Sequence, residues 1–392
     1  MKNRYYSYLN STKQIIARYT GEEPLSIYLK KFFSSDKRYG SKDRKLISHS
    51  CYCYFRLGKM ATDLPADERI LLGLFLCTDK PGEMLAALKP EWSEHITITT
   101  QHKIEKSGFH FSVSEIFPWK SEMSEGIDYD KFCESFLIQP GLFLRLRPGY
   151  EKTVQKKLIA AGFNFSIVHS NCLELSNSSK VDAVVELDKE AVVQDLNSQK
   201  VGELFRLVRQ GPSGKPEKLW DCCAASGGKS LMLHDLFPDI DLTVSDKRES
   251  ILINLRKRFA KAGITNYESF ISDLSIPLKQ SQKNKYNLII ADVPCSGSGT
   301  WSRTPEQLYF FDGSKIIEYS NLQKKIVNNV IPFLEPGGFL LYITCSVFKK
   351  ENEEVAAFLK ERHGLELKHM QLFAGYDKKA DTLFAALFYK PL

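Results

Sequence analysis

The sequence lacks a long apolar run, a secretion signal and a metal-binding cysteine pattern. Its longest apolar stretch, ILLGLFLC at 70–77, is far below the roughly 20 residues of a membrane-spanning helix. The N-terminal segment MKNRYYSYLN is polar, so we expect a protein that stays in the cytoplasm and has no membrane partner. The nine cysteines are scattered and form no CxxC pair, which argues against a disulfide framework and against zinc. We therefore predict free thiols and no bound metal.

Positive charge is concentrated at the N-terminus. Residues 1–60 contain 13 Lys and Arg against four Asp and Glu, a net charge of +9, whereas the whole chain has +7. A basic segment joined to a nearly neutral remainder is typical of an arm that binds a polyanion such as RNA. As the only concentrated positive region of the sequence, it should supply much of the RNA affinity. Tyr5, Tyr6, Tyr8 and Tyr19 lie there and could stack on bases. The alternatives are a solvated helix face without a partner and aromatics that belong to the core.

Three patterns of apolar residues predict three domains. Residues 1–135 show the three- and four-residue spacing of amphipathic helices, with a capping signal at Ser41 or Asp43, and form an all-α domain. Residues 138–200 combine strand-like pieces (GLFLRLRP, NFSIVHSNCLEL and DAVVELD) with one helix (EKTVQKKLIAAG) and form a small α+β module. In residues 201–392 short apolar strands alternate with helices, as in a doubly wound, Rossmann-like α/β sheet.

The first strand of the third domain leads into a glycine turn, WDCCAASGGKS at 220–230. Gly227 and Gly228 let the backbone approach a ligand, but the turn fits neither the dinucleotide motif nor the P-loop motif. Asp246 ends the next strand, where a carboxylate can bind both hydroxyls of a ribose. Asp273 ends the following strand and could accept from an adenine amino group. Together these three strand ends have the layout of an S-adenosylmethionine site, although each acid alone could instead cap a helix.

The next two strands end in cysteines. Cys295 follows Asp292 in NLIIADVPC, and Cys345 closes FLLYITCS, so both are expected on the same rim of the sheet. Methyl transfer to carbon 5 of a pyrimidine needs a thiolate, because addition of sulfur to carbon 6 turns the unreactive carbon 5 into a nucleophile. Asp292 is the candidate to contact the base, and Lys349 and Lys350 are candidates to stabilise the thiolate. For either cysteine alone, the alternative is a buried thiol without chemistry.

These motifs resemble those of the RsmB/Sun-type (NOL1/NOP2/Sun family) RNA cytosine-5 methyltransferases. DCCAASGGKS is similar to the family's DLCAAPGGKT, ADVPCSGSG to DAPCSGxG, and YITCSVFKKENEEV to Y.TCS...EN..V. VVQDLNSQKVGELF (192–205), RTPE (303–306) and DTLFAALFYK (381–390) also resemble family segments, so the resemblance covers about 138–392. YGSKDRKLISHSCYCYFRLGK is similar to the NusB-like N-terminal domain of the subgroup that methylates small-subunit rRNA.

The resemblance implies a role for each matched residue. Cys345 would be the nucleophile, Cys295 would help to release the product, and Asp292 would contact the target base near S-adenosylmethionine. The implied cofactor-binding residues are Cys223, Ala224, Ala225, Ser226, Gly227, Gly228, Lys229, Asp246, Asp273 and Asp292. Ser226 replaces the usual proline, Val293 replaces alanine, and LFLRLRPG has arginine where an RxN segment often has asparagine, but no catalytic group is lost. The implied partner is rRNA, with tRNA as the alternative, and we expect a monomer.

Two interpretations of other classes stay open. A non-catalytic RNA-binding or ribosome-assembly factor on a methyltransferase scaffold would bind the cofactor without making product. A thiol enzyme using Cys295 and Cys345 as a redox pair would leave the acids of the cofactor layout unexplained.

Overall fold

The computed structural model describes residues 2–209, 216–278 and 285–392, without the side chains of Lys2 and Asn3. The chain divides into two compact units. The first comprises Met1–Ser121, Ile127–Gln139 and Thr300–Gly313, and the second comprises Glu122–Gly126, Pro140–Gly299 and Ser314–Leu392. The RTPE segment, expected in the third domain, therefore groups with the helical unit.

The first unit is helical. Its α-helices are α1 (Lys2–Arg18), α2 (Leu25–Ser35), α3 (Ser41–Arg56), α4 (Ala66–Leu76), α5 (Glu83–Leu88), α6 (Pro90–Ser93), α7 (Thr100–Ser107), α8 (Tyr129–Ser135) and α14 (Pro305–Phe310). Of the two capping candidates for α3, Asp43 makes the contact, because its carboxylate accepts from the Gly40 N–H at 2.8 Å. Tyr5, Tyr8 and Tyr19 are buried in this unit, so of the four N-terminal tyrosines only Tyr6, which is 53% exposed, offers an open ring.

The α14 segment is held in the helical unit by polar and aromatic contacts. The Leu25 N–H donates to Glu306 at 3.1 Å, and the Lys59 ammonium donates to the Tyr309 carbonyl at 2.7 Å. The Phe310 ring lies 5.7 Å from that of Tyr19. These contacts join residues more than 200 positions apart, which explains why local sequence patterns assign the segment elsewhere.

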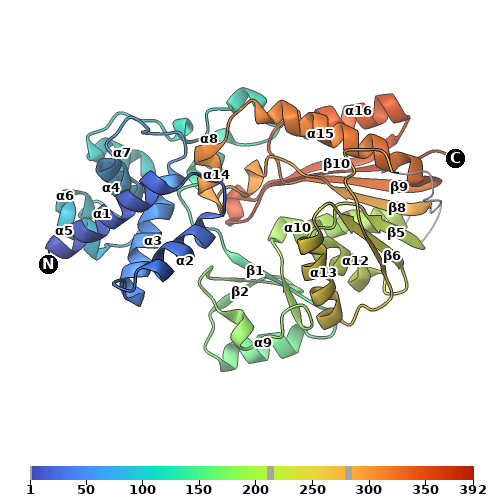
Figure 1. The fold of residues 1–392 in the computed structure, drawn as a ribbon, viewed down its shortest axis with the longest axis horizontal. Coiled ribbons are helices and arrows are strands. Elements are labelled where there is room, and N and C mark those ends of the chain that lie inside the picture. The colour runs from blue at the N-terminus through green and yellow to red at the C-terminus, as the bar shows by residue number, and fades with distance from the viewer. Residues whose placement is uncertain (1, 210–215, 279–284) are drawn as a thin grey trace. The chain divides into compact units, whose positions relative to one another are not determined.

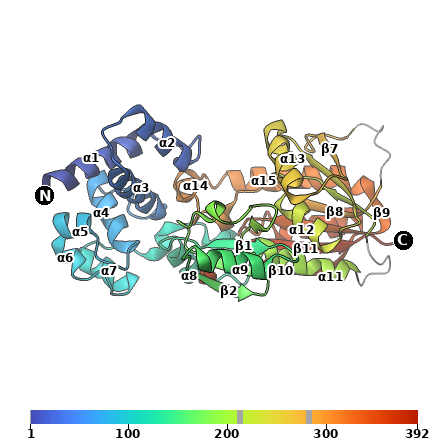
Figure 2. The same ribbon diagram turned by 90° about the horizontal axis from the view of Figure 1, so that it is seen from below.

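A four-stranded antiparallel sheet lies in the second unit. Its strands are β1 (Leu142–Leu146), β2 (Phe165–His169), β3 (Cys172–Leu175) and β4 (Ala191–Val193), in the order β2-β3-β1-β4. Helix α9 (Glu151–Ala160) packs its Val154 and Leu158 against this sheet (Figure 2). The predicted strand DAVVELD is wrong. Asp182 and Ala183 belong to the 3₁₀-helical turn η3 (Val181–Ala183), and within residues 182–188 only Leu187 makes a β-bridge, an isolated one to Ala191. Val181 and Val185 enter the core of the module from this turn, so their apolar character reflects burial and not strand pairing.

The second sheet of this unit has seven strands. They are β5 (Lys218–Asp221), β6 (Asp241–Asp246), β7 (Glu268–Ile271), β8 (Tyr286–Asp292), β9 (Leu334–Thr344), β10 (Glu366–Phe373) and β11 (Leu383–Tyr389). Their order is β10-β11-β9-β8-β5-β6-β7. The five strands from β9 to β7 run parallel, and β11 and β10 add antiparallel neighbours at one edge. The expected Rossmann-like α/β fold is confirmed.

Helices cover both faces of the large sheet because its central strands are apolar on both sides. Along β8, Leu288 and Ile290 face one core, whereas Ile289 and Ala291 face the other. The first core is closed by α11 (Leu204–Arg209), α12 (Gly228–Leu236) and α13 (Glu249–Ala262), and the second by α15 (Lys315–Val330) and α16 (Glu353–His363) (Figure 1). The short helix α10 (Leu196–Lys200) precedes α11 in the chain.

The remaining helical turns are short. They are η1 (Val113–Ile116), η2 (Lys120–Glu122), η4 (Val201–Glu203), η5 (Ser298–Thr300), η6 (Ile331–Phe333) and η7 (Tyr376–Lys378). Within residues 2–209, 216–278 and 285–392, none of the helices combines the length and the apolar character that crossing a bilayer requires.

Candidate active site

The glycine turn predicted at 220–230 connects β5 to α12. Gly227 has φ = 79°, and a Cβ there would lie 2.8 Å from the Phe259 ring, so both conformation and space require glycine. The turn is fastened to the end of β6 by two backbone donors. The Ala224 N–H reaches the Ser245 carbonyl at 2.9 Å, and the Ala225 N–H reaches the Asp246 carboxylate at 3.0 Å.

The two predicted acids lie at the ends of neighbouring strands. Asp246 ends β6 and accepts from the Arg248 N–H at 2.9 Å as well as from Ala225. Asp273 follows β7 and accepts from Ser275 and, at 2.7 Å, from the Lys247 ammonium. The Lys247 hydrogen bond, helped by the Ser275 donors, lowers the pKa of Asp273 to about 2. Each acid therefore accepts from the backbone N–H two residues further on, and both residues line a cavity.

That cavity, which we call the strand-end cavity, has a volume of 540 Å³. It lies beyond the carboxyl ends of the parallel strands, where ligands bind in sheets of this kind. It is lined by Cys222, Cys223, Ala225, Asp246, Lys247, Arg248, Ser272, Asp273, Leu274, Ser275, Asp292, Val293, Pro294, Cys295, Leu322, Ile326 and Cys345. The acids of three strand ends and the cysteines of two thus open into one space.

Several residues of the predicted cofactor loop do not line the strand-end cavity. Ala224, Gly227 and Gly228 are not among its lining residues, and Ser226 points to solvent, where its carbonyl accepts from Arg258 at 2.8 Å. The side chain of Lys229 is only 11% exposed and donates to Asp292 at 2.5 Å. Burial alone would lower the pKa of this ammonium, but the charges of Asp292 and Cys345 raise it above its usual range.

Lys229 is thus the cation that interacts with Cys345. The expectation for Lys350 was wrong, because its ammonium is bound to Glu122 at 2.5 Å, and Lys349 is exposed. The positive charge near Cys345 thus comes from Lys229 of α12 and not from the two lysines that follow Cys345 in the sequence.

Cys295 and Cys345 are neighbours. The Cys345 N–H donates to the Cys295 sulfur at 3.3 Å, and both thiols line the strand-end cavity at intermediate exposure. The hydrogen bond with the Cys345 side chain, reinforced by burial, raises the pKa of the Cys295 thiol well above its usual range. A protonated Cys295 thiol is therefore a hydrogen-bond donor beside the Cys345 sulfur.

A buried carboxylate fixes the backbone behind both cysteines, and no role was assigned to it from the sequence. Glu351 is fully buried and accepts from the Ser296 N–H at 2.9 Å, from Gln323 at 2.9 Å and from the Ser346 hydroxyl at 2.7 Å. Ser296 follows Cys295, and Ser346 follows Cys345. Burial raises the pKa of Glu351 even though these donors oppose the shift. The EN pair in YITCSVFKKENEEV, which contains Glu351, is the sequence pattern from which this carboxylate could have been predicted.

The two cysteine loops also touch directly. The Gly299 N–H donates to the Cys345 carbonyl at 2.9 Å, and a Cβ on Gly299 would lie 1.9 Å from the Thr382 carbonyl. Only glycine allows this approach. In the part of the chain that the structure describes, no three His, Cys, Asp or Glu side chains gather in a way that could hold a metal ion.

Comparison with known proteins finds a family model that resembles part of the second unit. Residues 212–387 match the model of the 16S rRNA methyltransferase RsmB/F family. The ribosomal RNA small subunit methyltransferase B of Proteus mirabilis (strain HI4320) is 26% identical over 225 residues, which are 57% of this chain and 51% of that protein. The matched region is therefore about half the length of this curated relative.

Solved structures share the fold. The crystal structure of PH0851 has a TM-score of 0.67 with 18% identity and covers 94% of this chain and 95% of its own. NSun6 from Pyrococcus horikoshii, solved with SFG, has a TM-score of 0.56 with 14% identity and covers 67% of this chain and 94% of its own. The strand-end cavity and its motifs lie within residues 212–387, the part of the chain that is similar to the RsmB/F family of rRNA methyltransferases.

Proposed function

We propose that this protein transfers a methyl group from S-adenosylmethionine to carbon 5 of a cytosine in RNA, through a transient bond between Cys345 and the base. The observation that carries the proposal is the pair of cysteines that line one cavity together with three strand-end acids. Methyl transfer to oxygen or nitrogen would leave both thiols without a role.

The donor groups of the cavity suit S-adenosylmethionine. Asp246 suits the ribose hydroxyls, Asp273 an adenine amino group, and the glycine turn brings backbone close to the ligand. NSun6, a structural neighbour of the same fold, was solved with the S-adenosylmethionine analogue SFG. Bound in this cavity, the cofactor would supply an electrophilic methyl group.

The chain's own residues prepare the base. The Cys345 sulfur, which lies beside that of Cys295, adds to carbon 6 as a thiolate, and carbon 5 then carries the negative character that the methyl group needs. Asp292 lies in the cavity at the end of β8 and is assigned to contact the base. After the transfer, a base removes the proton from carbon 5, and the bond between the Cys345 sulfur and carbon 6 breaks. We assign Cys295 to this release of the product.

The substrate class follows from the family. The matching family model and the Proteus mirabilis relative are named for the methylation of small-subunit rRNA, and we propose rRNA as the substrate here, with the cytosine unpaired or flipped so that carbons 5 and 6 can reach the thiol. The basic helical unit and the four-stranded module are proposed to hold the RNA. We also propose that the enzyme acts in the cytoplasm as a monomer.

The test is to incubate the purified protein with S-adenosylmethionine labelled in the methyl group and with unmodified small-subunit rRNA, then to analyse the nucleosides by mass spectrometry. We expect labelled 5-methylcytidine, and bisulfite sequencing then gives its position. A different methylated nucleoside would overturn the assigned chemistry. Cofactor binding without any labelled nucleoside, in rRNA or tRNA, would favour a non-catalytic scaffold.

A further inference from the structure

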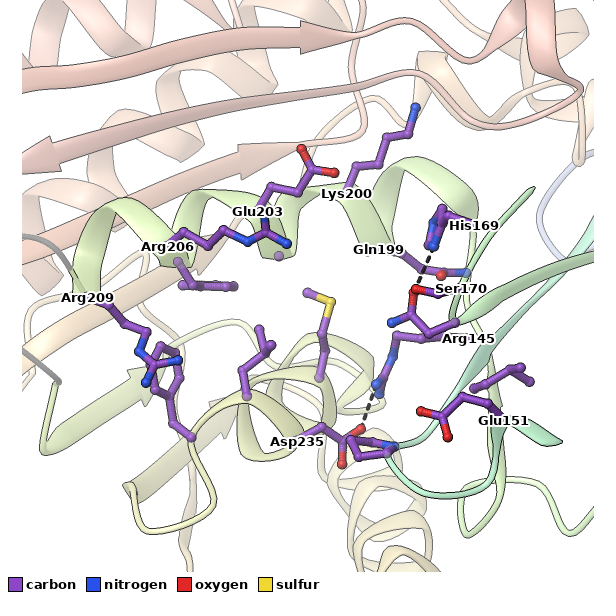
Figure 3. Close-up of a pocket in the computed structure, with 18 residues that line it drawn as sticks. Arg145, Glu151, His169, Ser170, Gln199, Lys200, Glu203, Arg206, Arg209 and Asp235 are labelled. Carbon is purple, nitrogen blue, oxygen red and sulfur yellow. Dashed lines mark hydrogen bonds and ion pairs between the residues drawn. The ribbon is translucent and has the colours of Figure 1, made fainter. Parts of the chain in front are cut away.

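A second cavity in the same unit is lined by arginines. It has a volume of 440 Å³ and lies between the four-stranded sheet and helices α10, α11 and α12. We call it the arginine cavity, after Arg145 of β1 and Arg206 and Arg209 of α11. Figure 3 shows Arg206 and Arg209 on one side, across from Arg145 and Asp235. Leu146, Met232 and Leu236 give it an apolar surface.

The arginine cavity is lined by four cations and three acids, and at its border with a neighbouring hollow Arg147 joins a buried cluster of charges. Arg145 donates to Asp235 at 2.6 Å, and Arg147 donates to the same carboxylate at 2.8 Å. Their side chains are 4% and 11% exposed, and that of Asp235 is 6% exposed. One carboxylate thus faces two nearly buried guanidinium groups, and one positive charge remains without a counter-ion among these three residues.

Two buried polar atoms of the cavity residues have no partner. The Nη2 of Arg145 and the Oε1 of Gln199 make no hydrogen bond with any described residue, although both are buried. The other guanidinium nitrogens of Arg145 are used by Gln194 and Asp235, and the amide nitrogen of Gln199 donates to the Gln194 carbonyl. An unpaired buried donor is costly, so a ligand that accepts at Arg145 and donates to Gln199 would be stabilised there.

A neighbouring hollow extends the positive surface. It also has a volume of 440 Å³, shares Pro148 and Asp235 with the arginine cavity, and adds Arg147, Lys189 and Lys261. Together the two hollows have seven Lys and Arg against three acids among their lining residues, a net charge of +4. The charge of the chain outside residues 1–60 is about −2, so this is a local concentration.

We propose that the arginine cavity binds a nucleotide of single-stranded RNA, separate from the cytosine that is methylated. A phosphate would accept from Arg206 and Arg209, an oxygen of the base or of the next phosphate would accept from Arg145 across the cavity, and the ribose 2′-hydroxyl or a base amino group would donate to Gln199. The apolar side chains would contact the face of the base. The next phosphates of an RNA chain could bind to the cations of the adjoining basic hollow. This continuation favours an RNA chain over a free nucleotide as the ligand.

The proposal rests on the proposed function in one respect only, namely that the bound nucleotide belongs to an RNA. The test measures equilibrium binding of a fluorescently labelled single-stranded RNA 10-mer by anisotropy over a range of salt concentrations, with no methyl donor present. Wild-type protein is compared with the double variant Arg206→Ser/Arg209→Ser. The control is Lys360→Ser/Arg362→Ser, which removes the same charge from exposed positions on α16. Thermal melting checks that both variants are folded.

We expect the Arg206→Ser/Arg209→Ser variant to bind at least about tenfold more weakly, with a salt slope smaller by about 1.4, and the control to bind as the wild type does. A parallel titration with cytidine 5′-monophosphate distinguishes the source of the nucleotide. If the monophosphate binds the wild type but not the double variant while RNA binding is unchanged, the RNA assignment is overturned in favour of a free nucleotide. If neither ligand distinguishes the double variant from the control, the site itself is refuted. Because no methylation is measured, these results are independent of the test of the proposed function.

Discussion

The strand-end cavity and the arginine cavity have volumes of 540 and 440 Å³, but they are assembled in different ways. The first collects residues that directly follow parallel strands, which all end at the same edge of the sheet. The second collects residues from β1, the β2–β3 turn, α10, α11 and α12, which meet only through tertiary packing. The topology of the sheet therefore brings together the residues of the strand-end cavity, whereas tertiary packing brings together those of the arginine cavity.

The comparison also separates two ways of using charge. In the strand-end cavity each charged group has a specific partner, such as Lys229 with Asp292 and Lys247 with Asp273. In the arginine cavity and its neighbouring hollow, cations outnumber acids. The first arrangement suits a defined chemical step, and the second suits a repeating anion.

The largest effect is expected for Cys345→Ser. We expect it to lower methyl transfer at least about 1000-fold while leaving cofactor affinity unchanged, because the bond to carbon 6 can no longer form. The measurement is single-turnover methylation of rRNA together with calorimetric titration of S-adenosylmethionine. Cys222→Ser is the matched control, since Cys222 lines the same cavity and is assigned neither to the reaction nor to cofactor binding. Equal losses in both variants would assign the effect to the shape of the cavity.

A smaller effect is expected for Asp246→Asn. The carboxylate is proposed to bind the ribose hydroxyls, and loss of a charged hydrogen-bond partner costs about 1.5–3 kcal/mol, so we expect S-adenosylmethionine to bind roughly 10- to 100-fold more weakly. Asp241→Asn provides the control, because Asp241 is exposed at the opposite end of the same strand. Unchanged affinity in Asp246→Asn, measured by calorimetry, would show that the cofactor lies elsewhere.

The smallest effect is expected for Asp221→Asn, and it concerns the stability of the protein instead of its activity. Burial raises the pKa of Asp221, at the end of β5, to about 7, despite a hydrogen bond from Ser230. The stability gained from the protonated carboxyl is complete below about pH 4 and is lost as the pH rises through about 7. In Asp221→Asn the unfolding free energy should therefore fall less steeply between pH 4 and pH 8, as followed by urea denaturation. A slope identical to that of the wild type would contradict the buried, protonated state.

Much of the strand-end cavity could be predicted because each residue follows a recognisable strand. Cys223, Ala225, Asp246, Asp273, Asp292, Cys295 and Cys345 all line it. Asp221 and Glu351 went unassigned because their roles arise from burial and from distant donors, which spacing does not reveal. Lys350 was chosen for its proximity in the sequence, whereas Lys229 approaches Cys345 from another element.

The arginine cavity could not be predicted for a related reason. The expectation that residues 1–60 are the only concentrated positive region was wrong, because folding gathers cations from positions 145 to 261 into two adjoining hollows. Similarly, α14 lies in the helical unit through contacts such as that of Glu306 with Leu25. Both features depend on residues that are distant in sequence, for which local periodicity carries no signal.

The most direct test of the central claim is to trap the bond between Cys345 and the base. Cys295→Ala protein is incubated with rRNA and S-adenosylmethionine, resolved on a denaturing gel, and digested for peptide mass spectrometry. We predict a covalent protein–RNA adduct on the peptide that contains Cys345, and no adduct in the Cys295→Ala/Cys345→Ala double variant. An adduct that forms instead when Cys345 alone is removed would reverse the roles of the two thiols, and persistent methylation by Cys345→Ala would contradict the account.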